Sequence, residues 1–421
     1  MLRPIQGIFY GWWIVLSFFI MNFYWAGALM LGLSALFNPI RDHFGFSATL
    51  TTIAITLRFT IGALVAPIIG YALDRFGPRP LVLGATFITA AGLALVIFSD
   101  STQSFFFGFV IAALGMSIFI AGTGPVAAAY WFIRRRGLAS SLLMSGAGMG
   151  ALLIPVVIWL EAGWGWRGAL GVILVGLLVI SIPLSLLLRH RPEQYGLNPD
   201  GDAPLTANRP GQAVGERGAS RPIEPDASFG AAMSSRAFWL SSTSQALAAL
   251  GGSAVTLFTI PHLEESGFSR TTAGLSTAGV GVIVVLSTLT FGWISDRLDK
   301  RKIIALSFLC QASGIAALVF ASSFWHLIPF AILFGMGSRS AFSVMTSLQA
   351  DYFGRTNFGK VQGIQFSIFT LGAASGPIIG AIIRDASGTY TPIFVAYIAT
   401  SLVAALAISL VKRPAIRQWT T

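Results

Sequence analysis

Residues 70–75, Gly-Tyr-Ala-Leu-Asp-Arg, recur in related form at residues 292–297, Gly-Trp-Ile-Ser-Asp-Arg, 222 positions further along the chain. Three more positions obey the same shift: Gly137, Gly150 and Pro155 in the first half, and Gly359, Gly372 and Pro377 in the second. One offset that holds across separate segments is typical of a duplicated structural unit. We therefore expect two halves that share one architecture.

The composition is that of a membrane protein. Of the 421 residues, 55% are hydrophobic and 10% are charged, and the mean hydropathy is +0.76. Soluble domains carry about 25% charged residues, so a soluble fold is excluded. Twelve apolar stretches are long enough to cross a bilayer as helices that satisfy their own backbone hydrogen bonds. They cover residues 11–37, 48–72, 81–98, 104–132, 138–160, 168–188, 237–262, 271–294, 303–321, 325–350, 361–383 and 391–411.

These stretches predict an all-α membrane protein with twelve transmembrane helices in two pseudo-symmetric six-helix bundles, residues 1–189 and 237–421. The one long polar segment, residues 190–236, lies between them and is rich in Pro, Gly and charged residues. It predicts a mostly flexible cytoplasmic linker. Residues 229–238 within it favour a short interfacial helix that leads into the seventh span.

The net charge of +11 follows the predicted topology and does not indicate nucleic-acid binding. With the N-terminus in the cytoplasm, 21 of the 27 Lys and Arg residues fall on the cytoplasmic side and four on the other side. This bias predicts a plasma (inner) membrane protein with both termini on the cytoplasmic side. No cleavable signal peptide is evident. The single cysteine, Cys310, excludes an intrachain disulfide.

Two motifs carry a resemblance to known families. Residues 70–79, GYALDRFGPR, resemble the signature that the major facilitator superfamily has between its second and third helices, and residues 296–301 resemble a weaker second copy. Residues 10–13, YGWW, and residues 131–139, WFIRRRGLA, resemble the branch of monocarboxylate and oxalate/formate carriers. The resemblance implies a transporter rather than an enzyme. It also implies a monomer that moves its substrate by alternating access.

The remaining two basic residues, Arg58 and Arg339, lie within apolar stretches. Each precedes a marker of the cytoplasmic helix end, Gly70 or Asp351, by twelve residues. Each therefore lies about 18 Å from that end, near the middle of a ~30 Å hydrocarbon core. A charge at this depth normally faces a wet cavity or the bundle interior. No carboxylate occupies the interior of any span, so we expect both arginines to bind the substrate, an anion.

Polar residues in the first and seventh spans are weaker candidates for substrate contact. Asn22, Gln245 and Ser253 can bond a substrate, but they can equally bond between helices. Arg58 and Arg339 also have an alternative role, as structural arginines that bond to helix carbonyls.

The repeated loop motif predicts a gate. Asp74 can accept hydrogen bonds from a neighbouring helix N-terminus, and Arg75 or Arg79 can pair across the interface between the halves. Gly70 and Gly77 permit close approach and a tight turn. The second copy contributes Asp296 and Arg297 to the same gating set.

These residues favour a secondary transporter of small organic anions, with monocarboxylates first and proton symport as one mode of coupling. The chain lacks the lysine in the first helix and the Asp/Arg pair in the eighth that better-known monocarboxylate carriers have. Dicarboxylate transport or anion exchange is therefore the alternative, followed by an anion receptor that does not transport. No metal-ligand cluster, phosphate-binding loop or nucleophile triad is visible, so we expect no metal, cofactor or enzymatic activity.

Overall fold

The computed structural model describes residues 9–45, 48–202 and 227–414, and every regular element within these ranges is a helix. The side chains at 34, 37, 38, 48–56, 58 and 270 lie outside this description. The first half contains α1 (Tyr10–Tyr24), η1 (Trp25–Leu31), α2 (Gly32–Phe44), α3 (Ala48–Phe76), α4 (Pro78–Ile97), α5 (Thr102–Ile120), α6 (Thr123–Trp131), α7 (Arg136–Met149), η2 (Gly150–Leu153) and α8 (Ile154–Leu186). The second half contains α10 (Arg236–Glu265), α11 (Arg270–Ser295), α12 (Lys300–Val319), α13 (Phe324–Ser338), α14 (Ser340–Phe353), α15 (Phe358–Ser387) and α16 (Thr391–Ser409).

The twelve predicted spans are present. Within the described residues, eleven segments are long and apolar enough to cross a membrane, and one of them, Arg136–Leu186, is 51 residues long. That segment holds two spans, because Gly165 inside α8 has φ 68° and ψ 174°, a conformation that turns the chain and favours glycine. The first candidate span is Tyr10–Leu31 and includes seven π-helical residues in η1, and α2 continues the helical run to Phe44, beyond the predicted end at residue 37.

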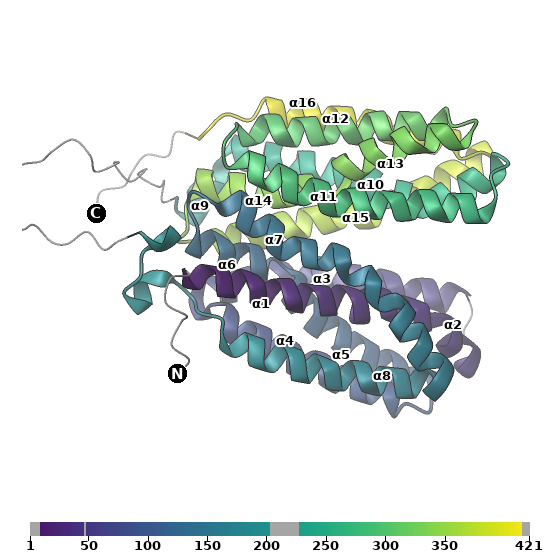
Figure 1. Ribbon diagram of the computed structural model, residues 1–421, viewed down its shortest axis with the longest axis horizontal. Coiled ribbons are helices and arrows are strands. Elements are labelled where there is room, and N and C mark those ends of the chain that lie inside the picture. Colours follow the sequence, from purple (N-terminus) through teal and green to yellow (C-terminus); the bar gives the residue numbers. More distant parts are fainter. Residues whose placement is uncertain (1–8, 46–47, 203–226, 415–421) are drawn as a thin grey trace, which may run out of the picture.

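The spans form two bundles that lie side by side, with their helices running roughly along the long axis of the molecule, α1–α8 in one bundle and α10–α16 in the other (Figure 1). Helix α3 packs against α15, and α7 packs against α11. These two contacts are equivalent under the 222-residue shift, so the interface between the halves is pseudo-symmetric. A small apolar cluster of Ala66, Ile69, Ala121 and Phe366 lies between the halves.

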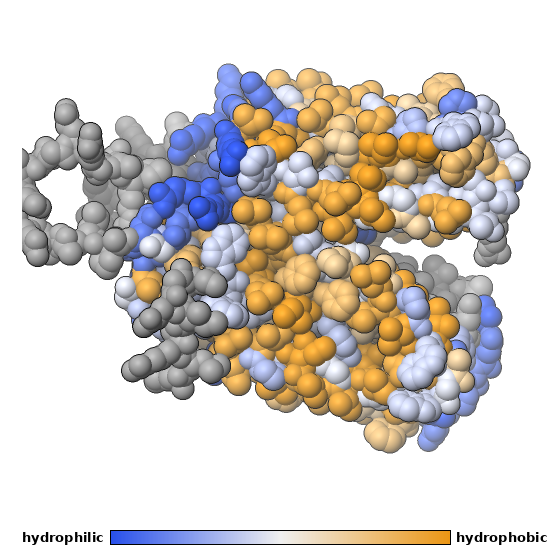
Figure 2. Space-filling view, in the orientation of Figure 1, coloured by the Kyte–Doolittle hydropathy of each residue, from blue (hydrophilic) through white to orange (hydrophobic). Residues whose placement is uncertain are grey.

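The two ends of the molecule differ. The first and last described residues lie at the same end, where polar side chains gather, and a broad apolar band covers the flank beside it (Figures 1 and 2). Figure 2 shows a notch between the two halves at the opposite end. We call these the closed end, near the termini, and the open end.

The connection between the halves is more ordered at its edges than predicted. Its first residues form η3 (Pro192–Tyr195) and η4 (Pro199–Gly201), and its last form α9 (Phe229–Ser234). Residues 203–226 lie outside the description. The short helix predicted for 229–238 ends at Ser234, because Ser235 caps α10 by accepting a hydrogen bond from Ala237 N at 3.1 Å.

Candidate functional site

Arg339 lies where a transmembrane helix is broken. It separates α13 from α14 with φ −131° and ψ −18°, inside the candidate span Phe324–Phe353. In a continuous helix Gly335 O would accept the Arg339 N–H. Here it accepts Ser287 Oγ at 3.2 Å instead, and Ser340 Oγ donates to Ser287 Oγ at 2.8 Å. Serine hydroxyls thus satisfy backbone groups that the break releases.

The Arg339 side chain is exposed and has no polar partner among the residues that the structure describes. Among the described residues, none forms a hydrogen bond or ion pair with its guanidinium group. One turn further toward the closed end, Ser343 Oγ and Ser141 Oγ meet at 2.9 Å, and both residues are buried between α14 and α7. The solvent-exposed part of this span therefore ends near Arg339. The guanidinium group, which has no described ion-pair partner, lies where the two halves begin to make contact.

The second intramembrane arginine, Arg58, lies within α3, but its side chain falls outside the described part of the structure. Its contacts, and its depth relative to Arg339, stay a prediction.

The three weaker candidates for substrate contact all bond between helices of their own half. Asn22 Nδ2 donates to Leu143 O at 3.0 Å, which joins α1 to α7. Ser253 Oγ donates to Ala373 O at 2.7 Å, which joins α10 to α15. Gln245 Oε1 accepts a hydrogen bond from Gln365 Nε2. In this structure these groups hold equivalent helix pairs together, and their contact with a substrate stays a prediction.

A set of glutamine amides near the interface retains bonding capacity. Gln245 Nε2, Gln365 Oε1 and both polar side-chain atoms of Gln362 are buried without a described partner. Gln362 lies against the first half, since a Cβ added to Gly122 would be 3.0 Å from its Cγ. Buried amides without partners are uncommon and mark places where water or a polar ligand can bind.

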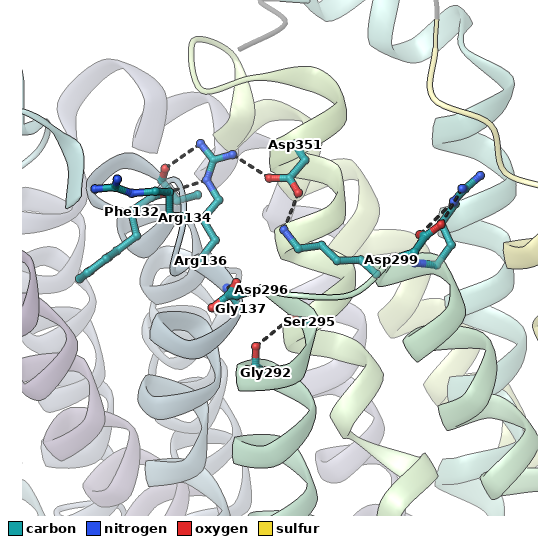
Figure 3. A network of polar contacts seen from close by, with 12 residues as sticks. Phe132, Arg134, Arg136, Gly137, Gly292, Ser295, Asp296, Asp299 and Asp351 are labelled. Atoms are coloured by element: carbon teal, nitrogen blue, oxygen red, sulfur yellow. Dashed lines mark hydrogen bonds and ion pairs between the residues drawn. The ribbon is translucent and has the colours of Figure 1, made fainter. Parts of the chain in front are cut away.

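The closed end is held by two equivalent carboxylate contacts. Asp74 in α3 accepts hydrogen bonds from Gly359 N at 2.6 Å and Lys360 N at 2.9 Å, at the start of α15. Asp296, 222 positions later, accepts hydrogen bonds from Gly137 N at 2.7 Å and Leu138 N at 2.9 Å, at the start of α7 (Figure 3). A carboxylate at a helix N-terminus satisfies free N–H groups and opposes the helix dipole.

Glycines let the backbones meet beside both carboxylates. A Cβ at Gly70 would overlap Gly359 O, and a Cβ at Gly292 would overlap Ser141 Oγ and lie 2.8 Å from Gly137 O. The tight turn expected at Gly77 is also present, with φ 79° at the start of α4. Close approach therefore needs glycine on both sides of the pseudo-symmetric interface.

Among the described residues, the expected pairing of Arg75 or Arg79 across the interface does not occur. Arg75 is exposed and donates to Tyr71 Oη in its own helix at 3.1 Å, and Arg79 is exposed without an ion pair to any described residue. Arg297, the counterpart of Arg75, lies over the Trp293 ring at 3.8 Å, also within its own helix. Arg75 and Arg297 do not pair across the interface in this structure because a long basic side chain at a helix end reaches the aromatic residue one turn earlier more easily.

A different arginine crosses the interface. Arg136, 1% exposed, donates to Phe132 O at 2.7 Å and Ala129 O at 3.3 Å in its own half, and to Asp351 Oδ1 at 3.0 Å in the other (Figure 3). Lys300 Nζ donates to the second oxygen of Asp351. Sequence reasoning missed this network, although the run Arg134–Arg136 and a terminal Asp351 were its available signals.

The connecting segment adds contacts at the same end. Arg355 donates to Tyr130 O and forms an ion pair with Glu193 Oε1, each at 2.9 Å. His190 packs against Gly77 and the Tyr130 ring, with ring centroids 5.3 Å apart. Burial, and then the charge of Arg191, lowers the pKa of His190 to about 4, whereas Glu193 opposes the shift.

The site therefore combines a solvent-exposed cation at a helix break with a sealed end that both halves build in the same way. No group of three or more His, Cys, Asp or Glu residues that could hold a metal occurs in the described ranges. A model of the Major Facilitator Superfamily matches residues 13–258 and again residues 242–420. The chain belongs to the major facilitator superfamily.

Relatives and solved structures within this superfamily agree with the fold. Monocarboxylate transporter 12-B of Danio rerio is 25% identical over 402 residues, which cover 91% of this chain and 83% of that protein. The oxalate:formate antiporter of Oxalobacter formigenes is 25% identical over 391 residues, covering 89% and 86%. The crystal structure of the major facilitator superfamily transporter FucP in the outward conformation superposes with a TM-score of 0.73 at 15% identity, covering 95% and 99%. The chain is thus a membrane transporter of this superfamily and not an enzyme.

Proposed function

We propose that this protein is a secondary active transporter of small organic anions, with monocarboxylates as its first substrate class, and that Arg339 binds the substrate carboxylate. The observation that carries the proposal is a guanidinium group at mid-span that is exposed at a helix break and forms no ion pair or hydrogen bond with a described residue. Its planar pair of donors fits a carboxylate in a bidentate arrangement. The names of the relatives, monocarboxylate transporter and oxalate:formate antiporter, support the same substrate class.

Binding sites at broken helices near the bilayer centre are common in transporters. An empty site leaves the Arg339 charge uncompensated at this depth, which is costly. A bound carboxylate neutralises this charge and lowers the cost of closing the open end over the site. Arg58 is the proposed second cation, and Gln245, whose Nε2 is unpaired, is the most suitable of the polar candidates for an additional contact.

We assign the closed end to the cytoplasmic side of the plasma (inner) membrane, with both termini inside. The excess of Lys and Arg in the loops at that end supports this orientation. The structure then represents a state open to the outside. Release to the cytoplasm requires the Asp74, Asp296 and Arg136 contacts to break, so these residues form the proposed gate together with Gly70, Gly77 and Gly292.

Anion exchange, with oxalate-like dicarboxylates included, is the second candidate for the mode of transport. Among described spans, the carboxylates nearest the interface, Asp74, Asp296 and Asp351, all lie at the closed end. Transporters that couple to protons commonly use an acid inside the membrane. No described acid inside the membrane lies near Arg339 to carry a proton. Exchange for a second anion, which binds the same site on the return step and neutralises the Arg339 charge, therefore needs fewer groups than proton symport.

Transport by purified protein in proteoliposomes tests the proposal. Uptake of formate, lactate and oxalate is measured with and without a pH gradient, and with and without preloaded counter-substrate. We expect Arg339→Ala to abolish uptake and Arg339→Lys to weaken binding at least tenfold, since a charge-assisted hydrogen bond contributes about 1.5–3 kcal/mol. Arg384→Ala, which removes an exposed ion pair with Glu265, is the control and should transport normally.

The outcome that rejects the proposal is an Arg339→Ala protein that binds and transports these anions like the wild type. Thermal unfolding of each variant shows whether a loss of uptake reflects misfolding. Because Arg339 has no described carboxylate partner, its removal leaves no buried acid and should preserve the melting temperature. Acceleration by preloaded anion but not by a pH gradient identifies exchange, and the reverse identifies symport.

A further inference from the structure

The closed end contains a basic cavity that the transport cycle does not require. It encloses about 520 Å³ and is lined by six basic residues and three acidic ones. Ile133, Arg134 and Arg136 come from the first half, and the other lining residues come from the second half. A cavity that is shared by the two halves and has an excess of three positive charges is suited to bind an anion.

Each acidic residue of this cavity already has a hydrogen-bond or ion-pair partner. Asp296 accepts two backbone N–H groups, Asp299 is paired with Arg301, and Asp351 is held by Arg136 and Lys300 (Figure 3). Among the described residues that line the cavity, no carboxylate therefore remains to neutralise the other basic residues.

Two of those basic residues have no carboxylate partner within the described ranges. The Arg297 and Arg413 guanidinium groups form no ion pair and no hydrogen bond with any described residue, and both residues are exposed. Arg297 lies over the Trp293 ring, 3.8 Å away. Two cavity-lining guanidinium groups without a described carboxylate partner, together with the Lys300 ammonium group, offer several donors to a compact anion such as phosphate.

The position of the cavity indicates where that phosphate comes from. Trp293, 46% exposed, lies one turn before Arg297, and Leu298, 63% exposed, follows it directly. Exposed tryptophan beside a cation at the end of a transmembrane helix marks the level of the lipid headgroups. Basic pockets between helices on the cytoplasmic side bind acidic headgroups.

We propose that this cavity, lined by Arg134, Arg297, Lys300 and Arg413, binds the phosphate group of an acidic phospholipid. A lipid bound here contacts both halves and stabilises the closed end. The assignment of this end to the cytoplasm rests on the proposed function, but phosphate binding itself does not depend on Arg339.

The test counts lipids retained by the purified full-length protein in native mass spectrometry, after exchange into phosphatidylglycerol or phosphatidylcholine. The double variant Arg297→Gln, Arg413→Gln removes the two free cations and touches no ion pair. We expect its retention of phosphatidylglycerol to fall roughly 30-fold, since each basic residue contributes about fivefold to attraction for an acidic lipid. Phosphatidylcholine retention should not change.

Arg75→Gln is the matched control, because Arg75 is the repeat counterpart of Arg297 and is equally exposed beside an aromatic ring but does not line the cavity. Arg339→Ala should keep phosphatidylglycerol, which separates this result from the test of transport. A second arm adds inorganic phosphate. If phosphatidylglycerol stays bound in the presence of inorganic phosphate, the site binds the lipid headgroup. If phosphate displaces the lipid, the site binds a soluble anion instead. Equal losses in the double variant and Arg75→Gln, or no loss in either, overturn the proposal.

Discussion

The Asp74 contact and the Asp296 contact are copies of one another, yet their surroundings differ. Both carboxylates accept two backbone N–H groups from the first turn of a helix in the opposite half, at distances of 2.6–2.9 Å. Asp74 also accepts Tyr130 Oη at 2.6 Å. Tyr352, the counterpart of Tyr130, forms no such bond with Asp296 in the described structure.

The second contact is reinforced differently. Beside Asp296 lies the Arg136–Asp351–Lys300 network, which spans the interface. Its members correspond under the 222-residue shift to Phe358, Ala129 and Pro78, none of which is charged. The helix caps are thus common to both copies, whereas among the described residues the tyrosine hydroxyl bonds the aspartate only at Asp74 and the ion network lies only beside Asp296. The two contacts should therefore respond differently to equivalent substitutions.

The largest effect is expected from Arg136→Met. This removes a fully buried cation that satisfies Phe132 O, Ala129 O and Asp351, and breaking a buried pair costs about 3 kcal/mol or more. The closed end should open in a large fraction of molecules, which distances between spin labels on α3 and α15 can measure. Arg134→Met, next to it but 63% exposed, is the control. Equal label distances in both variants would contradict a role for the network in closure.

An intermediate effect separates the two carboxylates. Asn in place of either Asp presents one oxygen and one amino group, so one backbone N–H faces a donor, at a cost of about 1–3 kcal/mol. We expect Asp74→Asn to slow transport more than Asp296→Asn, because Asp74 serves three donors and Arg136 still holds the second contact. Anion affinity should change little in both variants. Loss of affinity without a change in label distances would place Asp74 in the binding site instead.

A smaller effect isolates the tyrosines. Tyr130→Phe removes one hydrogen bond to Asp74 and should weaken the closed end by about 1 kcal/mol. Tyr352→Phe removes a hydroxyl that Asp296 does not use and should have no effect on closure. The comparison uses the same label distances, and similar shifts in the two variants would show that the hydroxyl bond is not the cause of the difference.

These contrasts also show what the sequence could predict. The apolar stretches predict the twelve spans, because their length is a local property of the sequence. The repeated loop motif predicts the pairing of Asp74 with a helix N-terminus, because a shared offset indicates duplicated structure. It does not predict the Arg136 network, since unique residues carry no second copy to mark them. The break at Arg339 was also missed. It depends on hydroxyls from α11 that replace a helical hydrogen bond, and such tertiary compensation leaves no local pattern.

The smallest effect concerns pH and tests whether His190 acts only on the Asp74 side. The position equivalent to His190 is Lys412, so the second contact has no histidine. In the closed state burial lowers the pKa of His190 from 6.5 to about 4. A solvent-exposed imidazole takes up its proton near 6.5, so as pH falls from about 6.5 to about 4 the proton favours states in which the ring is released. The stability of the closed end should therefore decrease across this window and level off below it.

Label distances on α3 and α15, recorded as the pH is lowered through this window, measure the effect. His190→Gln cannot take up the proton and should show a flatter profile, whereas His326→Gln at the open end should follow the wild type. We expect a modest shift because the ring is only half-buried, so solvent screens much of the pKa difference. An unchanged profile in His190→Gln would assign the pH response to other groups. The asymmetry between the two contacts would then rest on Tyr130 and Arg136 alone.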